Sequence, residues 1–140
     1  MAGRYRFLEH TADVLFEAYG STFEAALESA AEAMFSVMSR IDELREERSF
    51  HVEERAGSLE NLTVFTLSAI LSGSEIEDVM PKRFEVESLE HRGGEFLLKG
   101  KVHGEKREGK KVKREIKAVT HHLLKIERNG KVSIRVLLDI

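Results

Sequence analysis

An apolar stripe with helical spacing constrains the fold of this chain more than any other feature of its sequence. The stripe consists of Phe23, Ala26, Leu27, Ala30, Ala31, Met34, Phe35 and Met38. Apolar residues that recur every three or four positions share one face of an α-helix, so the stripe predicts an amphipathic helix packed on a core. Ser21 and Glu24 have the spacing of a capping box, and the helix is expected to run from there to about Arg40.

A second helix is predicted after Ser58, which precedes another apolar series with the same period. This series consists of Leu59, Leu62, Phe65, Thr66, Ala69 and Ile70. Ser58 is a good N-cap, and Gly73 is expected to end the helix, because glycine is the commonest residue just past a helix end.

The rest of the chain alternates apolar and polar residues in short runs, as β-strands do. Strands are expected around Tyr5 and Phe7, at 14–19, around Phe50 and Val52, and at 84–89, 95–102, 112–119, 124–126 and 132–138. Asn129-Gly130 predicts a type I′ turn in the last hairpin. Strands at both ends of the chain and two helices inserted early indicate an α+β fold. We expect a single domain over residues 1–140, an antiparallel sheet with two helices packed on one face.

Composition narrows the class of protein. The chain has 140 residues, 41% hydrophobic and 34% charged, and it has no cysteine. These proportions are those of a globular protein, and the lack of cysteine excludes disulfides and cysteine-based zinc or redox sites. No apolar run approaches the roughly 20 residues of a membrane helix, so we expect a cytoplasmic protein without a membrane partner.

Positive charge is concentrated in about one fifth of the chain. Residues 99–125 hold ten Lys or Arg against three Glu, a net charge of +7 in a chain whose total is −3. Such a segment can dock on RNA phosphates or on an acidic protein face, or it can be the solvated outer face of a hairpin. No aromatic residue is interleaved with the charges, which argues against direct, sequence-specific RNA binding.

Two aspartates lie where predicted strands begin or end, one near each end of the chain. Asp13 follows the first strand, Asp139 closes the last one, and Ile140 adds its terminal carboxylate. If the two strands pair, these groups form an all-oxygen acidic site of the kind that Ca²⁺, Mg²⁺ and Mn²⁺ prefer. The alternative is that an aspartate at a bend only accepts a hydrogen bond from a nearby backbone N–H.

Histidines offer a second candidate site. His10 and Asp13 flank one bend, and such a pair is suited to acid–base work. A small metal-dependent hydrolase that uses Asp13, Asp139 and His10 is therefore an alternative function. His121 and His122 are adjacent, and in a regular strand they would point to opposite faces. The chain has no phosphate-binding glycine loop and no nucleophile elbow, so nucleotide hydrolysis and acyl transfer lack a motif.

Taken together, four segments resemble the archease family over the whole chain. They are 7–13 (Phe-Leu-Glu-His-Thr-Ala-Asp), the Ala-rich helix after Tyr19-Gly20, 117–122 (Lys-Ala-Val-Thr-His-His) and the final Asp139-Ile140. The resemblance implies an antiparallel sheet with helices on it and no autonomous catalytic activity. It implies an accessory protein of the RtcB-type tRNA-splicing RNA ligase, which promotes guanylylation of the ligase and multiple turnover. RNA would then be only an indirect partner.

The resemblance also implies roles for individual residues. Asp13, Asp139 and the terminal carboxylate of Ile140 match the metal-binding positions of the family, and calcium is the ion implied. Lys117 and His10 fall in the matching segments and are expected to act in contact with the ligase. The second helix departs from the family, because residues 64–70 (Val-Phe-Thr-Leu-Ser-Ala-Ile) replace the Trp-Leu-Asn-Glu-Leu-like run common in relatives.

Overall fold

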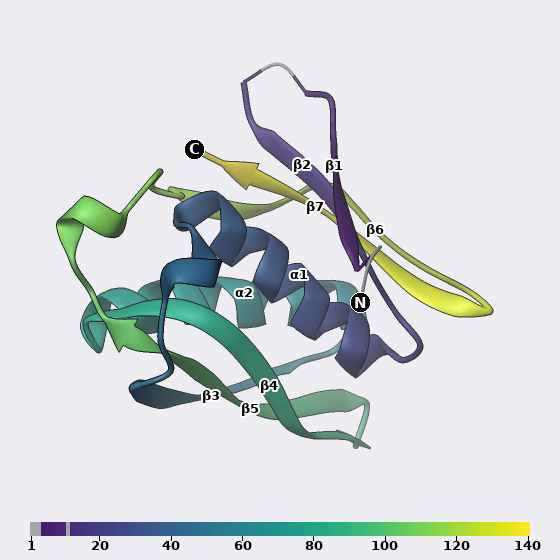
Figure 1. Ribbon diagram of the computed structural model, residues 1–140. Helices are drawn as coiled ribbons and strands as arrows, with labels where there is room; N and C mark the ends of the chain where they lie inside the picture. Colours follow the sequence, from purple (N-terminus) through teal and green to yellow (C-terminus); the bar gives the residue numbers. More distant parts are fainter. Residues whose placement is uncertain (1–3, 11) are drawn as a thin grey trace.

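The fold consists of two antiparallel sheets with the helices between them (Figure 1). The computed structural model describes residues 4–10 and 12–140. In order along the chain, its elements are β1 (Tyr5–Leu8), β2 (Val14–Gly20), α1 (Phe23–Met38), η1 (Ile41–Glu43), β3 (Arg48–Ala56), α2 (Leu59–Ile76), β4 (Val79–Arg92), β5 (Glu95–Lys106), η2 (Gly109–Lys111), β6 (Ala118–Asn129) and β7 (Lys131–Asp139), where η denotes a 3-10 helix.

The strand orders are β1-β2-β7-β6 in the first sheet and β3-β5-β4 in the second. Helix α1 packs on β2 and β7 of the first sheet and on β4 of the second, while α2 packs on β3 and on β6. The predicted α+β class, the antiparallel pairing and the two helices are confirmed. The expectation of one sheet differs from the structure, because strand alternation shows which side chains are buried but not which strands share a sheet.

Helix α1 supplies the centre of the core, as its apolar stripe predicts. Leu27, Met34 and Phe35 have no exposed surface. The N-cap is Thr22, whose hydroxyl accepts the Ala25 N–H at 3.1 Å, so the expectation that Ser21 caps the helix is wrong.

Helix α2 begins after Ser58, whose hydroxyl accepts the Asn61 N–H at 3.1 Å, as predicted. It does not end at Gly73 but continues to Ile76. A Cβ on Gly73 would lie 2.6 Å from the ring of Phe50, so the glycine provides close contact between α2 and β3. It serves packing here, and not helix termination.

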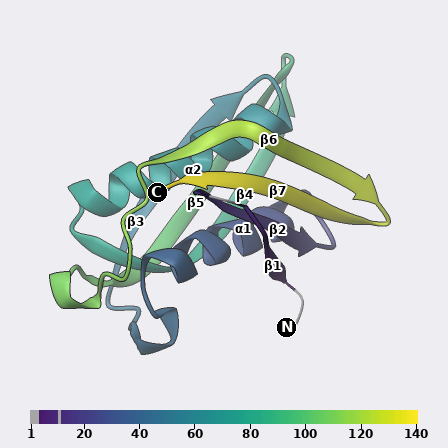
Figure 2. The same ribbon diagram turned by 90° about the horizontal axis from the view of Figure 1, so that it is seen from above.

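The segment 107–117, which we call the strap, connects β5 to β6 (Figure 2). The Lys113 N–H donates to the Met38 carbonyl at 2.7 Å, and Val112 forms an isolated bridge with Ser39. The predicted strand at 112–119 therefore starts only at Ala118, because the strap bonds to the end of α1 and not to a neighbouring strand.

Strands β6 and β7 form the predicted hairpin. Gly130 has a φ of 80°, but Asn129 is not in the positive-φ region, so the turn is not type I′. Earlier in β6 the pairing with β7 shifts register, since Thr120 pairs with Leu137 but Lys125 pairs with Arg135. Residues 121–124 form a bulge, and His121 within it contacts α2.

None of the helices in the described part of the chain is long and apolar enough to cross a membrane.

Candidate site at one end of the first sheet

The register of the first sheet brings the two predicted aspartates to neighbouring positions. Val14, the first residue of β2, pairs with Leu138 of β7. One residue further out, Asp13 precedes β2 and Asp139 ends β7, so the two occupy facing positions on adjacent antiparallel strands. Asp13 is partly buried and Asp139 is exposed.

The last strand is held firmly up to its end. Leu138 is completely buried, and the Asp139 carbonyl accepts the Lys117 N–H at 2.7 Å. Chain termini fray when nothing holds them. Here the burial of Leu138 and the bond from Lys117 fix the backbone position of Asp139.

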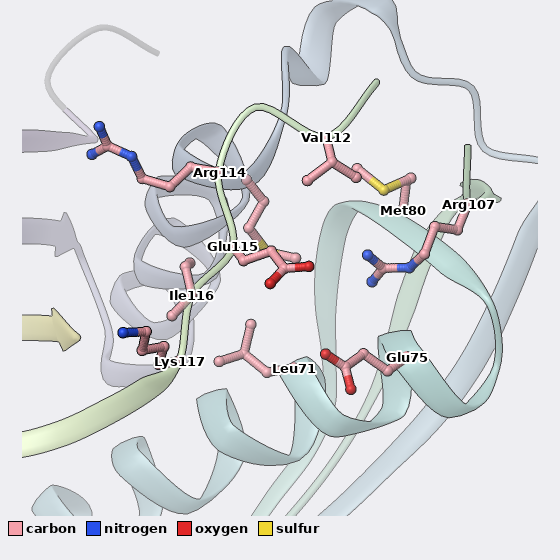
Figure 3. A pocket seen from close by; sticks show the side chains of 10 residues that line it. Leu71, Glu75, Met80, Arg107, Val112, Arg114, Glu115, Ile116 and Lys117 are labelled. Carbon is pink, nitrogen blue, oxygen red and sulfur yellow. The ribbon is translucent and has the colours of Figure 1, made fainter. Parts of the chain in front are cut away.

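Lys117 lies at the same end of the sheet as the aspartates. It precedes Ala118, which pairs with Asp139, and its side chain is exposed. In Figure 3 the Lys117 ammonium points away from Glu75 and Arg107. We call this end of the first sheet the tip, with residues 9–10, 13, 117 and 139–140.

His10 follows the end of β1 by two residues and is exposed at the tip. Its neighbour Thr11 lies outside the described residues. His121 belongs elsewhere: its Nε2 is 3.0 Å from Asn61 Oδ1 on α2, and its ring meets that of Phe65 edge-on. The bulge in β6 thus gives His121 a packing role against α2.

The tip offers oxygen ligands, but it is not a closed metal cage. Within residues 4–10 and 12–140, no three His, Asp or Glu side chains converge as a metal site. The two side-chain carboxylates are hard anionic ligands, so they suit Ca²⁺, Mg²⁺ or Mn²⁺ and would leave other coordination positions open.

A cavity of about 280 Å³ lies beside the tip, between the strap and α2 (Figure 3). Its polar lining includes Glu75, Arg107, Arg114, Glu115 and Lys117. The Nε of Arg107 is buried and has no hydrogen-bond partner within the described residues. From this set the sequence predicted a site role for Lys117 and placed Arg107 and Arg114 only in the basic segment, because the polar lining comes from α2 and the strap and no spacing in the sequence connects them.

Comparison with known proteins identifies the family. Residues 5–140 match the model of the Archease protein family. The chain belongs to the archease family. It is 38% identical over 140 residues to protein archease of Methanosarcina mazei, covering 98% of this chain and 96% of that one. It is 33% identical to protein archease of Pyrococcus furiosus, covering 98% and 99%.

Solved structures agree with the fold of this archease-family chain. The solution structure of Methanobacterium thermoautotrophicum protein 1598 superposes with a TM-score of 0.84 at 29% identity, over 98% of this chain and 99% of that one. A crystal structure of an archease from Thermotoga maritima superposes with a TM-score of 0.58 at 21% identity, over 95% and 94%, and supports the fold alone. The resemblance noted from the sequence is thus confirmed, and the archease family is generally one of non-catalytic accessory proteins.

Proposed function

We propose that this protein activates an RtcB-type tRNA-splicing RNA ligase, promoting its guanylylation and multiple turnover, and does not itself join RNA. Membership of the archease family supports this function. The observation that carries it is the register of β2 and β7, which gathers Asp13, Asp139 and the chain terminus at one exposed end of the sheet. An accessory protein needs such a projecting, chemically distinct end to reach another enzyme's active site.

A divalent cation, calcium by the family resemblance, would be held by Asp13, Asp139 and the Ile140 carboxylate. When bound, it would supply positive charge and open coordination positions for oxygen ligands of the ligase or its nucleotide. The residues themselves orient the site: Leu138 anchors the strand, and the Lys117 N–H fixes the Asp139 backbone.

The tip is the part that would enter the nucleotide cleft of the ligase. A cleft that binds GTP and metal ions is favourable for an acidic tip and unfavourable for the basic strap. Lys117 and His10 would contact the ligase or its nucleotide there. Phe7, with 49% of its surface exposed, lines a hollow with Val14 and Arg114 next to the tip, and adds apolar contact area.

Multiple-turnover ligation by the ligase of the same organism, with GTP and metal, tests the function. We expect the protein to raise the turnover, and Asp13→Asn, Asp139→Asn and Lys117→Ala each to abolish the increase even at saturating protein. Asp42→Asn, an exposed aspartate on η1, is the matched control and should activate normally. Unchanged ligase turnover with the wild-type protein would refute the proposal. Hydrolysis of a phosphate ester without ligase would favour the metal-dependent hydrolase instead.

Calorimetric titration with Ca²⁺, Mg²⁺ and Mn²⁺ tests the metal site separately. Binding should be lost in Asp13→Asn, in Asp139→Asn and in a variant with two glycines added after Ile140. If the extended variant bound metal and activated normally, the terminal carboxylate would have no role.

The strap would contribute mainly to the rate of association with the ligase or nearby RNA, through its positive charge. Two of its lysines also have structural partners: Lys111 Nζ is 2.7 Å from Glu105 and Lys113 Nζ is 3.0 Å from the Ser36 carbonyl. Lys106, the last residue of β5 next to the strap, and Arg114 within it are therefore the better pair to replace. A Lys106→Ala/Arg114→Ala variant should lose potency, more so at low salt, yet recover full activation at high protein concentration.

A further inference from the structure

The outer edge of β3 is open and regular. Within the described residues, β3 pairs only with β5, in one unbroken register from Arg48–Gly104 to Ala56–Phe96. An edge strand presents unpaired backbone N–H and C=O groups that another strand can use. The opposite edge of this sheet, β4, is protected by Pro81 and by two register shifts, whereas β3 has neither proline nor bulge.

A groove of about 540 Å³ runs along this open edge. It is lined by residues 49–54 of β3, by Ala69, Gly73 and Ile76 of α2, and by Glu77, which follows the helix. Successive side chains of a strand point to opposite faces, so a groove lined by six consecutive residues runs along the edge of the strand. The three α2 residues follow helical spacing and form one face. The groove therefore lies between a free strand edge and a helix.

The helix side of this β3 groove combines small residues with one exposed apolar side chain. Ala69 and Gly73 keep α2 close to β3, and the ring of Phe50 occupies the space a Gly73 side chain would take. Ile76, at the end of the helix, has 79% of its surface exposed. It offers an apolar contact to anything that enters the groove.

The charged side chains that line the β3 groove are acidic. Its lining contains Glu53, Glu54 and Glu77 and neither Lys nor Arg. Within the described residues, none of the three carboxylates takes part in an ion pair, and Lys99, opposite Glu53 on β5, does not pair with it. Burial raises the pKa of the Glu54 carboxyl above its usual value, as expected for a carboxylate without a compensating cation.

We propose that the β3 groove binds an extended, basic segment of a partner protein, which adds to the sheet as a strand beside β3. Backbone hydrogen bonds to the free edge would give affinity. Lys or Arg side chains facing Glu53, Glu54 and Glu77, and an apolar side chain facing Ile76, would give specificity. A second copy of the chain fits poorly, because pairing two β3 edges brings two sets of three carboxylates together. A nucleic acid would be repelled by the same charge.

An octapeptide, Lys-Lys-Val-Lys-Lys-Val-Lys-Lys, labelled with fluorescein, is the probe, because lysines at neighbouring positions can reach carboxylates on both faces of the strand. Fluorescence anisotropy should show binding that weakens from about 0.05 M to about 0.5 M NaCl, because the contacts are largely ionic. The same peptide with glutamate in place of lysine should not bind. Two versions N-methylated at alternate residues test the backbone pairing, since each removes the donors of one possible pairing pattern; at least one should fail to bind.

Variants locate the binding site. Glu53→Gln/Glu54→Gln should weaken binding roughly twofold to thirtyfold, the effect of losing two exposed charge pairs. Ile76→Ser, at an exposed position, should weaken it without altering the fold. Glu75→Gln removes the same charge from the same helix outside the groove and should bind as the wild type does. Circular dichroism checks that each variant is folded.

Three outcomes would overturn the proposal: binding by the double variant as tight as by the wild type, binding of both N-methylated peptides as tight as that of the unmodified peptide, or a dimer of the protein alone that the double variant abolishes. Amide exchange gives an independent measurement, because the bound peptide should slow exchange along β3 and not along β4. The assay contains no ligase, so its result does not depend on whether the protein activates one.

Discussion

Glu105 connects the strap to the body of the protein, and its replacement tests how the strap is held. The carboxylate lies on β5 with its side chain only 7% exposed. One oxygen accepts the Arg45 N–H at 2.7 Å, and the other is 2.7 Å from Lys111 Nζ at the start of the strap. These bonds lower the pKa of Glu105, the bond from Lys111 contributing most and that from the Arg45 N–H next.

Glu105→Gln should destabilise the protein by about 2 kcal/mol, the usual contribution of a hydrogen bond to a charged group. The cost should not reach the range for breaking a buried ion pair, because the lysine retains contact with water and glutamine can still accept the Arg45 N–H. For a chain of this size, the change corresponds to a fall in melting temperature of about 6 °C.

The pH dependence gives the prediction its sharpest form. A carboxyl whose pKa is lowered by folding adds stability above its ordinary pKa of about 4.3, and that stability is lost as the pH falls through the folded-state pKa. Urea denaturation followed by circular dichroism should therefore show a difference in stability between wild type and Glu105→Gln at about pH 7, and this difference should vanish as the pH falls through the folded-state pKa. Glu47→Gln replaces an exposed glutamate two residues after Arg45 and is the control; its stability should differ little from that of the wild type. A wild-type-like midpoint for Glu105→Gln at neutral pH would refute the reasoning.

Other predictions concern the core and two unusual backbone positions, all measured by urea denaturation. Leu62→Ala should cost about 2–5 kcal/mol, because Leu62 is fully buried on α2. Gly104→Ala should cost about 3 kcal/mol, since its Cβ would overlap the carbonyl oxygen of Met80; a neutral effect would mean that β4 can shift away. Leu123→Asn should stabilise by about 0.5–1 kcal/mol, because φ at this position is 61° and asparagine tolerates that region better; a loss would show that the leucine's contacts outweigh its strain.

Helix positions followed from the sequence because one periodic signal determined them. The stripe from Phe23 to Met38 needs no knowledge of partners to predict a buried helix face. The start of this helix was predicted less well, because it depends on which hydroxyl accepts a free backbone N–H. Thr22 does so in place of Ser21. At Gly73 the error had a tertiary cause, since the contact with Phe50 lies between residues far apart in the sequence.

Sheet membership and the strap could not be predicted in the same way. Val112 has strand-like neighbours, but its bridge is to Ser39 at the end of α1, which no local pattern reveals. An acidic site was predicted on the condition that the first and last strands pair or lie close. The last strand in fact pairs with β2, which separates it from β1, and Asp13 and Asp139 come to facing positions because Asp13 precedes β2. Their metal-binding role remains a prediction.

Helix α2 raises the question of whether the β3 groove and the tip act on each other. One face of the helix lines the groove through Ala69, Gly73 and Ile76, with Glu77 just after the helix end. Another face lines the cavities beside Lys117 through residues 68, 71, 72 and 75. No residue lines both, and the core holds the helix through completely buried side chains. A rigid helix with separate faces should keep the two sites independent. We therefore expect the stability changes of Glu53→Gln/Glu54→Gln and of Lys117→Ala to add within about 0.5 kcal/mol in the combined variant. A larger departure from additivity in urea denaturation would mean that α2 shifts as a unit. A strand bound in the groove would then alter the tip.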